Sequence, residues 1–310
     1  MRILLTGAAG FIGFHVAKAL LDRGDEVVGI DNLSDYYDPK LKDARLALLD
    51  HERFTFVKHD LEDPIKIESS FDVICHLAAQ AGVRYSIENP RVYEQSNALG
   101  TLNVFEFARQ QSIDRVVFAS SSSVYGNTDS IPFREDAVED RPISLYAATK
   151  RANELYAYTY HHLFGIKMTG LRFFTVYGPW GRPDMAYYSF TKAILEGVPI
   201  DVYNNGDQSR DFTYITDIVQ GVLAAIDTPF DYEIINLGRG KPEKLFDFIA
   251  EIERAIGTTA FKNLLPMQPG DVPSTYADVS KANRLLGYDP KVDLTDGIPR
   301  FVEWYTHTSR

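Results

Sequence analysis

The sequence contains a single cysteine, Cys75, among 310 residues, so no disulfide bond can form within the chain. Cys75 lies in an apolar run at residues 71–77, where a lone thiol is typically a small core residue, and this usage favours a reducing, cytoplasmic location. No apolar stretch is long enough to span a bilayer, and the N-terminus begins as a strand rather than a signal peptide, so no membrane association is expected. The histidines at 76, 161 and 162 lack the partner spacing of a metal site, so no metal is predicted.

The sequence also lacks an excess of basic residues. It has 32 Lys and Arg residues against 43 Asp and Glu residues, which argues against nucleic acid as a partner because the phosphate backbone is bound by positive charge. Hydrophobic residues make up 45% of the chain, enough for a large core in one domain or two.

The first residues predict an anion-binding turn. Residues 1–6 indicate a buried strand, glycines follow at Gly7, Gly10 and Gly13, and residues 11–23 form an amphipathic helical pattern. A tight turn through glycines into a helix N-terminus suits a pyrophosphate, because bare N–H groups and the positive helix end face the anion and the missing Cβ atoms let it approach. A glycine triplet alone is weak evidence, since many strand-to-helix turns need small residues.

A carboxylate at the end of the second strand strengthens this prediction. Residues 26–30 indicate a strand that ends in Asp31, eighteen residues after Gly13. An acid at this distance is placed to accept hydrogen bonds from the ribose hydroxyls of an adenine dinucleotide, and it would repel a 2′-phosphate, which favours NAD over NADP. Asp60 follows a short strand at 54–57 and is a candidate for the adenine edge, although an aspartate there also commonly caps a turn.

The alternation of strands and helices predicts an α/β fold: a Rossmann-type doubly wound parallel sheet with a smaller C-terminal substrate-binding lobe. We expect residues 1–172 to form the NAD-binding domain, with residues 212–238 returning to it, and residues 173–310 to form mainly the small lobe. A single helix is predicted over residues 90–111, and helices near 245–256, 280–286 and 295–305 are expected mostly in the small lobe. In such sheets the ligand lies beyond the carboxyl ends of the strands. The residues expected to bind the cofactor are Gly7, Gly10, Phe11, Ile12, Gly13, Asp31, Asn32, Asp60, Leu61, Leu77, Ala78, Ala79, Tyr146 and Lys150.

Two segments after the fifth predicted strand carry candidate catalytic groups. The first is the serine-rich run at 120–126, and the second contains Tyr146 and Lys150 on a helix over residues 144–165. Residues four apart share a helix face, so both side chains can point into one site. A neighbouring ammonium would lower the pKa of the phenol towards the range that a general base needs. The same spacing is common on surface helices, so only its combination with the dinucleotide loop predicts catalysis.

These motifs together resemble the extended short-chain dehydrogenase/reductase superfamily, specifically its nucleotide-sugar 4-epimerases. Residues 171–186 (LRFFTVYGPWGRPDMA) and 267–272 (MQPGDV) are most similar to the members that act on UDP-glucuronate. The resemblance extends over essentially the whole chain. It implies a catalytic triad of Ser121, Tyr146 and Lys150, NAD as cofactor, a UDP-sugar substrate and a homodimer.

Related enzymes differ from this chain at specific positions. Sugar-nucleotide dehydratases of the group carry an Asp-Glu pair, and the decarboxylases a glutamate, where this sequence has Ser122 and Ser123. Neither serine supplies the strong acid of those reactions. UDP-galactose 4-epimerases typically have an asparagine in place of Thr175 and an arginine in place of Gln268. Both differences argue against a neutral hexose.

The resemblance also implies contacts to the substrate. Arg182 is suggested by its own chemistry: if it lies within reach of the sugar, it and the hydroxyls of Ser122, Ser123 and Thr175 form a carboxylate site, because its planar fork suits a carboxylate. Tyr203 would lie close to the uracil, Arg210 would bridge the diphosphate, Asp271 would hold the uridine ribose, and Arg84 would also reach the substrate. Each of these is as readily explained as a core, surface or turn residue when taken alone. The full set expected to bind substrate is Arg84, Ser121, Ser122, Ser123, Thr175, Arg182, Tyr203, Arg210 and Asp271.

The expected activity is NAD-dependent C4 epimerisation of UDP-glucuronate to UDP-galacturonate through a transient 4-keto sugar. The competing enzyme hypotheses are a UDP-glucose/UDP-galactose 4-epimerase and a UDP-glucuronate decarboxylase. A third alternative is a non-catalytic NAD-sensing scaffold on the same fold. Loss of the base or its lysine would be typical of such a scaffold, and Tyr146 and Lys150 are both present.

Overall fold

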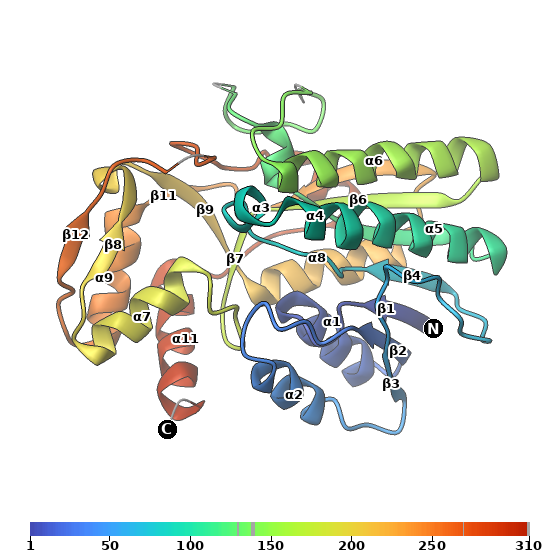
Figure 1. The fold of residues 1–310 in the computed structure, drawn as a ribbon, viewed down its shortest axis with the longest axis horizontal. Helices are drawn as coiled ribbons and strands as arrows, with labels where there is room; N and C mark the ends of the chain where they lie inside the picture. The colour runs from blue at the N-terminus through green and yellow to red at the C-terminus, as the bar shows by residue number, and fades with distance from the viewer. Residues whose placement is uncertain (129, 138–139, 269, 309–310) are drawn as a thin grey trace.

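The computed structural model describes residues 1–128, 130–137, 140–268 and 270–308. Its largest element is a seven-stranded sheet (Figure 1). The strands are β1 (Arg2–Thr6), β2 (Glu26–Asp31), β3 (Phe54–Lys58), β4 (Val73–His76), β5 (Arg115–Ser121), β6 (Lys167–Phe173) and β10 (Tyr232–Leu237). They lie in the order β10-β6-β5-β4-β1-β2-β3, and every neighbouring pair is parallel. This is the doubly wound sheet that the sequence predicts. Its order reverses between β1 and β4, where such sheets bind ligands.

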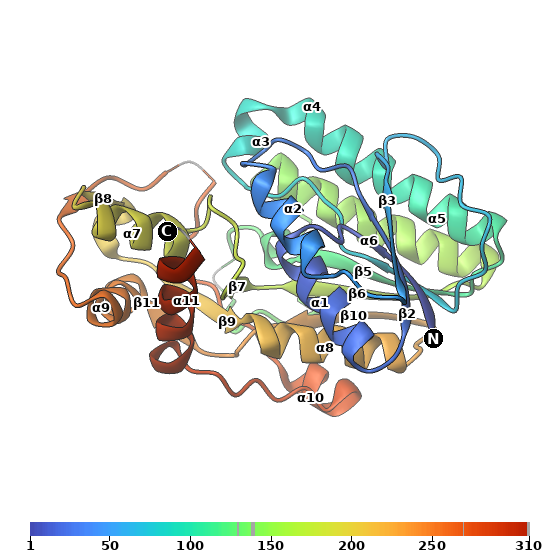
Figure 2. The same ribbon diagram turned by 90° about the horizontal axis from the view of Figure 1, so that it is seen from below.

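Helices cover both faces of this sheet (Figures 1 and 2). On one face lie α5 (Gly100–Gln110) and α6 (Leu145–Phe164), and on the other lie α1 (Phe11–Asp22) and α8 (Ile215–Asp227). Alternate side chains of β1 supply the two cores: Ile3 and Leu5 pack with α1 and α8, whereas Leu4 packs with α5 and α6. The central strands are therefore apolar on both sides, as expected for a buried parallel sheet.

The helix predicted over residues 90–111 is interrupted. It comprises α4 (Pro90–Tyr93), a π-helical segment (Glu94–Leu99) and α5, and a short α3 (Tyr85–Glu88) precedes it. The π-helical segment turns Asn97 into the interior, where its side chain is fully buried. Its Oδ1 accepts a hydrogen bond from the Gln80 amide at 2.8 Å, and its Nδ2 donates to the Thr149 hydroxyl at 3.1 Å. The segment thus ties the loop after β4 to α6.

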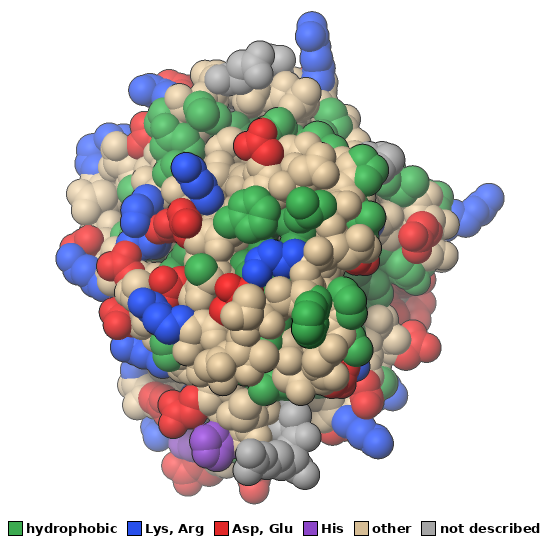
Figure 3. Space-filling view, turned by 90° about the vertical axis from the view of Figure 1, so that its left-hand side faces the viewer, with side chains coloured by type: hydrophobic (Ala, Val, Ile, Leu, Met, Phe, Trp, Pro, Cys, Tyr) green, Lys and Arg blue, Asp and Glu red, His purple; other side chains and the backbone are tan. Residues whose placement is uncertain are grey.

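A smaller lobe lies beside the carboxyl ends of the large sheet. It contains a three-stranded sheet of β7 (Thr175–Tyr177), β9 (Ser209–Tyr214) and β11 (Pro242–Lys244), and a two-stranded sheet of β8 (Ile200–Val202) and β12 (Lys262–Leu264). Its helices are α7 (Ala186–Glu196), α9 (Leu245–Ile256) and α11 (Leu294–Thr308). The outer surface on this side mixes charged side chains with scattered hydrophobic ones (Figure 3).

One helix lies elsewhere than the sequence predicts. Residues 280–286 are expected mostly in the small lobe, but α10 (Ser280–Leu286) packs against α8 and β10 of the large sheet. Ala282 is buried in the core beneath α8, and the hydroxyl of Tyr288 donates to the carbonyl of Gly238 at 2.9 Å. These contacts hold the helix against the last strand of the sheet.

The described residues include no helix that is both apolar enough and long enough to cross a membrane. Within the same residues, no group of three or more His, Cys, Asp or Glu side chains is arranged to hold a metal ion.

Candidate active site

The glycines of the loop between β1 and α1 lie in close contact with neighbouring main-chain atoms, which leaves no room for a Cβ. Gly7 has a φ of +74°, and a Cβ there would lie 2.8 Å from the amide nitrogen of Ala78. A Cβ on Gly13 would lie 2.0 Å from the carbonyl oxygen of Gly7. The helix begins at Gly10 without a side-chain cap, which leaves its first N–H groups for another acceptor. Backbone and helix end therefore fit the pyrophosphate of a dinucleotide.

Asp31 is fixed at the end of β2 beside this loop. Its carboxylate accepts hydrogen bonds from the amides of Ala9 at 3.2 Å and Leu33 at 2.8 Å, and the Lys42 ammonium lies 3.5 Å away. The second candidate acid, Asp60, accepts from Asn32 Nδ2 at 2.9 Å. Both carboxylates thus face the crevice from neighbouring strands, an arrangement that fits the adenosine half of NAD.

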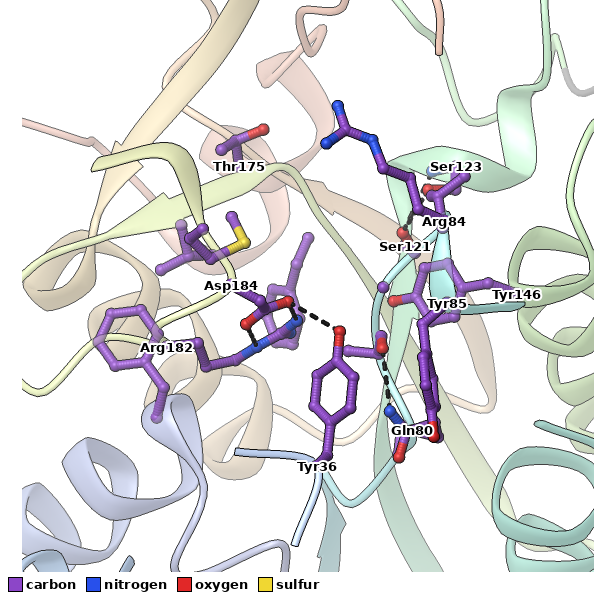
Figure 4. Close-up of a pocket in the computed structure, with 18 of the residues that line it drawn as sticks. Tyr36, Gln80, Arg84, Tyr85, Ser121, Ser123, Tyr146, Thr175, Arg182 and Asp184 are labelled. Carbon is purple, nitrogen blue, oxygen red and sulfur yellow. Dashed lines mark hydrogen bonds and ion pairs between the residues drawn. The ribbon is translucent and has the colours of Figure 1, made fainter. Parts of the chain in front are cut away.

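The candidate catalytic residues come from two elements: Ser121 is the last residue of β5, and Tyr146 and Lys150 lie in the first turns of α6. Lys150 is buried, its Nζ donates to the carbonyl of Ala119 at 2.9 Å, and burial lowers its pKa to about 8. The hydroxyl of Ser121 donates to Ser123 Oγ at 3.2 Å. Figure 4 shows Ser121, Ser123 and Tyr146 on one side of the cavity.

The pKa of Tyr146 differs from the sequence-based expectation. Burial raises this pKa, and the influences that lower it are a hydrogen bond with Ser121 and the positive charge of Arg182. The lowering expected from Lys150 stays a prediction; its ammonium donates to the Ala119 carbonyl at 2.9 Å. Arg182, from the small-lobe side, contributes a positive charge that lowers the pKa of this phenol.

Arg182 faces Tyr146 across the cavity and is paired with an acid that the sequence reasoning missed. Its Nε donates to Asp184 Oδ1 at 3.0 Å, and its Nη2 donates to Oδ2. Burial would lower the pKa of Arg182, but the charge and hydrogen bonds of Asp184 outweigh it, so the pKa lies above its usual value. Thr175, at the start of β7, lies on the same side of the cavity as this pair (Figure 4).

The candidate nucleotide contacts line the same cavity. Arg84 stacks over the ring of Tyr203, with 4.7 Å between its Cζ and the ring centroid, and its Nη2 lies 3.3 Å from Asp271 Oδ2. Arg210 donates to the carbonyls of Ser209 at 2.9 Å and Pro273 at 3.2 Å. Burial and Arg84 lower the pKa of Arg210, whereas Asp271 raises it. Of the nearby motif at 267–272, residue 269 lies outside the described residues.

One cavity of about 1030 Å³ brings all these groups together, and every candidate residue from the sequence lines it. Lining a cavity does not test a role, so the individual assignments stay predictions. The sequence reasoning missed several other residues of this wall, namely Tyr36, Lys42, Gln80, Tyr85, Asp184 and Tyr187. Tyr36 and Asp184 lie in polar or irregular stretches close to predicted site residues. This closeness in sequence is the one signal that could have identified them.

A parallel sheet with a glycine turn at its point of reversal, and a tyrosine–lysine helix facing the same cavity, define a dinucleotide-binding enzyme of the short-chain dehydrogenase/reductase type. A model of the NAD dependent epimerase/dehydratase family matches residues 3–238, and the chain belongs to that family.

Three relatives cover nearly the whole chain. An uncharacterized protein of Methanocaldococcus jannaschii is 57% identical, over 98% of this chain and 96% of its own length. UDP-glucuronate 4-epimerase 4 of Arabidopsis thaliana is 48% identical, over 98% of this chain and 75% of its own length. Among solved structures, UDP-glucuronic acid 4-epimerase from Bacillus cereus, in complex with UDP-glucuronic acid and NAD, has a TM-score of 0.92 and 37% identity, covering 99% of this chain and 100% of that one.

Proposed function

We propose that this protein is a UDP-glucuronate 4-epimerase, an isomerase that uses NAD to interconvert UDP-glucuronate and UDP-galacturonate. The observation that carries the proposal is that Ser121, Tyr146 and Lys150 line the same cavity as the glycine loop and Arg182. Relatives named for this activity support it, and so does the similarity to an enzyme solved with UDP-glucuronic acid and NAD.

In this proposal Tyr146 removes the proton of the C4 hydroxyl and later returns it to the opposite epimer. NAD⁺, held by the glycine loop and Asp31, would supply the acceptor for the C4 hydride and its later return, and its positive charge would favour the ionised phenol. Ser121 lowers the pKa of Tyr146 and so opposes the rise caused by burial. Lys150 holds the strand end through the Ala119 carbonyl. Contacts to UDP at Tyr203, Arg210 and Asp271 anchor the nucleotide while the sugar turns over.

Substrate choice rests on Arg182 and the hydroxyls of Ser122, Ser123 and Thr175. A uronate with a ketone at C4 is a β-keto acid, which loses carbon dioxide when the breaking bond lies parallel to the carbonyl π system. A site that fixes the carboxylate in another orientation suppresses this loss. Arginine suits that task, because its planar fork binds carboxylates with defined geometry.

We also propose the division into lobes given by the sequence: residues 1–172 with 212–238 bind NAD, and residues 173–310 mainly bind the UDP-sugar. The position of β10 in the large sheet supports the return of the chain to the first lobe. Residues 309–310 lie outside the described residues.

A homodimer is proposed through α5 and α6. Their outer surfaces expose Leu99 and Leu102 from one helix region, and Leu155 and Tyr158 from the other, and the two helices are in contact. Two helices from each copy would bury this apolar surface. Light scattering should give twice the mass of one chain, and a monomer would refute the assembly.

The cytoplasmic location that the single cysteine favours stays a prediction.

The deciding experiment is incubation of the purified protein with UDP-glucuronate and no added cofactor, followed by NMR. Formation of the axial C4 epimer, with NAD copurified, supports the proposal. Release of carbon dioxide and a UDP-pentose as the main product would identify a decarboxylase instead. Turnover of UDP-glucose in preference to UDP-glucuronate would identify the neutral-hexose epimerase.

A further inference from the structure

The acid beside Arg182 has no part in the mechanism above. Asp184 engages the Nε and Nη2 atoms of the guanidinium, and both side chains are about a quarter exposed, at 22% and 27%. Among the described residues, Nη1 of Arg182 donates no side-chain hydrogen bond to another group. An arginine held in this way presents one fixed edge to Asp184 and leaves its remaining nitrogen for a second acceptor.

Asp184 is held in turn by a tyrosine from the nucleotide-binding side. The hydroxyl of Tyr36 donates to Asp184 Oδ2 at 3.3 Å, across 148 residues of sequence (Figure 4). The ring of Tyr36 packs on that of Tyr85 at 4.8 Å, and a Cβ on Gly82 would lie 2.8 Å from the Tyr36 hydroxyl. Burial raises the pKa of Tyr36 to about 12, and the charge of Asp184 adds to the rise, so the phenol keeps its proton and remains a donor.

The backbone before Arg182 is fixed from behind by Arg45. This arginine is completely buried. Its Nη2 donates to the carbonyls of Trp180 at 2.7 Å and Gly181 at 3.3 Å, and its Nη1 donates to the carbonyl of Ala9 at 2.8 Å. The position of Arg182 is thus tied to the glycine loop through its main chain and to the segment after β2 through its side chain.

We propose that Asp184 and Tyr36 are positioning residues that fix the plane of the Arg182 guanidinium, so that Nη1 meets the carboxylate of the sugar in one orientation. The inference rests on the proposed function. An arginine without these contacts would still bind the carboxylate of a uronate, but its guanidinium could change orientation and so accept the carboxylate in several orientations. A restrained one keeps the carboxylate out of the geometry in which carbon dioxide leaves. Asp184 and Tyr36 therefore set the ratio of epimer to pentose product.

The test is a comparison of Asp184→Asn and Tyr36→Phe with the wild-type protein on UDP-glucuronate. Asp184→Asn replaces one acceptor oxygen by an NH2 group that faces the guanidinium, and we expect a rise in KM of about tenfold and a several-fold larger pentose fraction. Tyr36→Phe removes only a hydroxyl, and we expect a smaller change in the same two quantities. Asp184→Glu keeps the charge and should restore the product ratio in part.

The chain offers a matched control. Arg134 and Asp136 form the same two-point pair with the same spacing on the exposed surface, at 3.1 and 3.0 Å. Asp136→Asn should leave KM and the product ratio unchanged. Wild-type KM and product ratio in both Asp184→Asn and Tyr36→Phe would overturn the positioning role alone. A wild-type protein that forms no UDP-galacturonate would instead overturn the proposed function, and this inference with it.

Discussion

Arg172 and Glu154 form a buried two-point ion pair behind the candidate active site. The Nε and Nη2 atoms of Arg172 each donate to one carboxylate oxygen of Glu154 at 2.8 Å, and the two side chains are 2% and 0% exposed. Ser120, the residue before Ser121, donates to the same carboxylate at 2.6 Å. The pair therefore joins α6, β6 and the end of β5 beneath the catalytic groups.

Removing one partner of this pair should destabilise the fold strongly. Glu154→Gln leaves the Arg172 charge buried and unpaired, and we expect a loss of about 3 kcal/mol in the free energy of unfolding. Urea denaturation at pH 7 measures this loss. The double variant Glu154→Gln/Arg172→Met should lose less than the sum of the two single variants, because it leaves neither charge of this pair buried without its partner. Strict additivity would contradict the coupling.

The same pair has a defined pH dependence. Burial would raise the pKa of Glu154, but the hydrogen bonds and charge of Arg172 outweigh it, so the folded-state pKa lies below the usual value. Its contribution to stability is therefore present above the unfolded-state pKa of about 4.3 and is lost as the pH falls towards the folded-state value. The difference in stability between wild type and Glu154→Gln should shrink over that interval.

Features that depend on neighbouring residues were predictable from the sequence. The glycine loop, Asp31 and the Tyr146–Lys150 spacing each lie within one strand–turn–helix unit, so local pattern and chemistry determine them. The π-helical segment at residues 94–99 was not predictable, because its wider turn extends over only six residues, too few for the apolar pattern to show a change of period.

Partners that come from distant segments could not be predicted. In the sequence, Arg45 resembles any other charged residue of an amphipathic helix. It is buried because the backbone carbonyls of residues 9, 180 and 181 accept hydrogen bonds from its guanidinium. Tyr36 meets Asp184 only because the loop after β2 faces the loop after β7. Such contacts arise from the packing of two lobes, which periodicity does not specify.

Tyr146→Phe should abolish turnover without unfolding the protein. The phenol hydroxyl is the proposed base, and a positioned general base contributes roughly 10²- to 10⁴-fold to a rate. We expect kcat to fall by about 10³-fold or more, with copurified NAD and the thermal midpoint close to wild type. Epimerisation at the wild-type rate would remove Tyr146 as the base.

Arg182→Ala should weaken binding of the uronate and increase the pentose side product. Losing a hydrogen bond to a charged group costs about 1.5–3 kcal/mol, which corresponds to a rise of roughly 10- to 150-fold in the dissociation constant of UDP-glucuronate. UDP-glucose has no carboxylate, and its affinity should change little. Isothermal titration with both nucleotides distinguishes this effect from general damage, which would weaken both equally.

Gly13→Ala should release the cofactor. The added Cβ would lie 2.0 Å from the carbonyl oxygen of Gly7, which is backbone and cannot rotate away, so the glycine loop must move from the position in which its amides converge. We expect the protein to fold, because the large sheet and α1 are otherwise well packed. It should purify with a small fraction of the wild-type NAD content, which is measured by absorbance after denaturation. Gly165→Ala is a control for a glycine-to-alanine change without a clash, because nothing lies within 4 Å of a Cβ added there, and it should keep its NAD although the φ of +69° makes the substitution strained. Full NAD content in Gly13→Ala would mean that the cofactor does not depend on the close approach of α1 to β1.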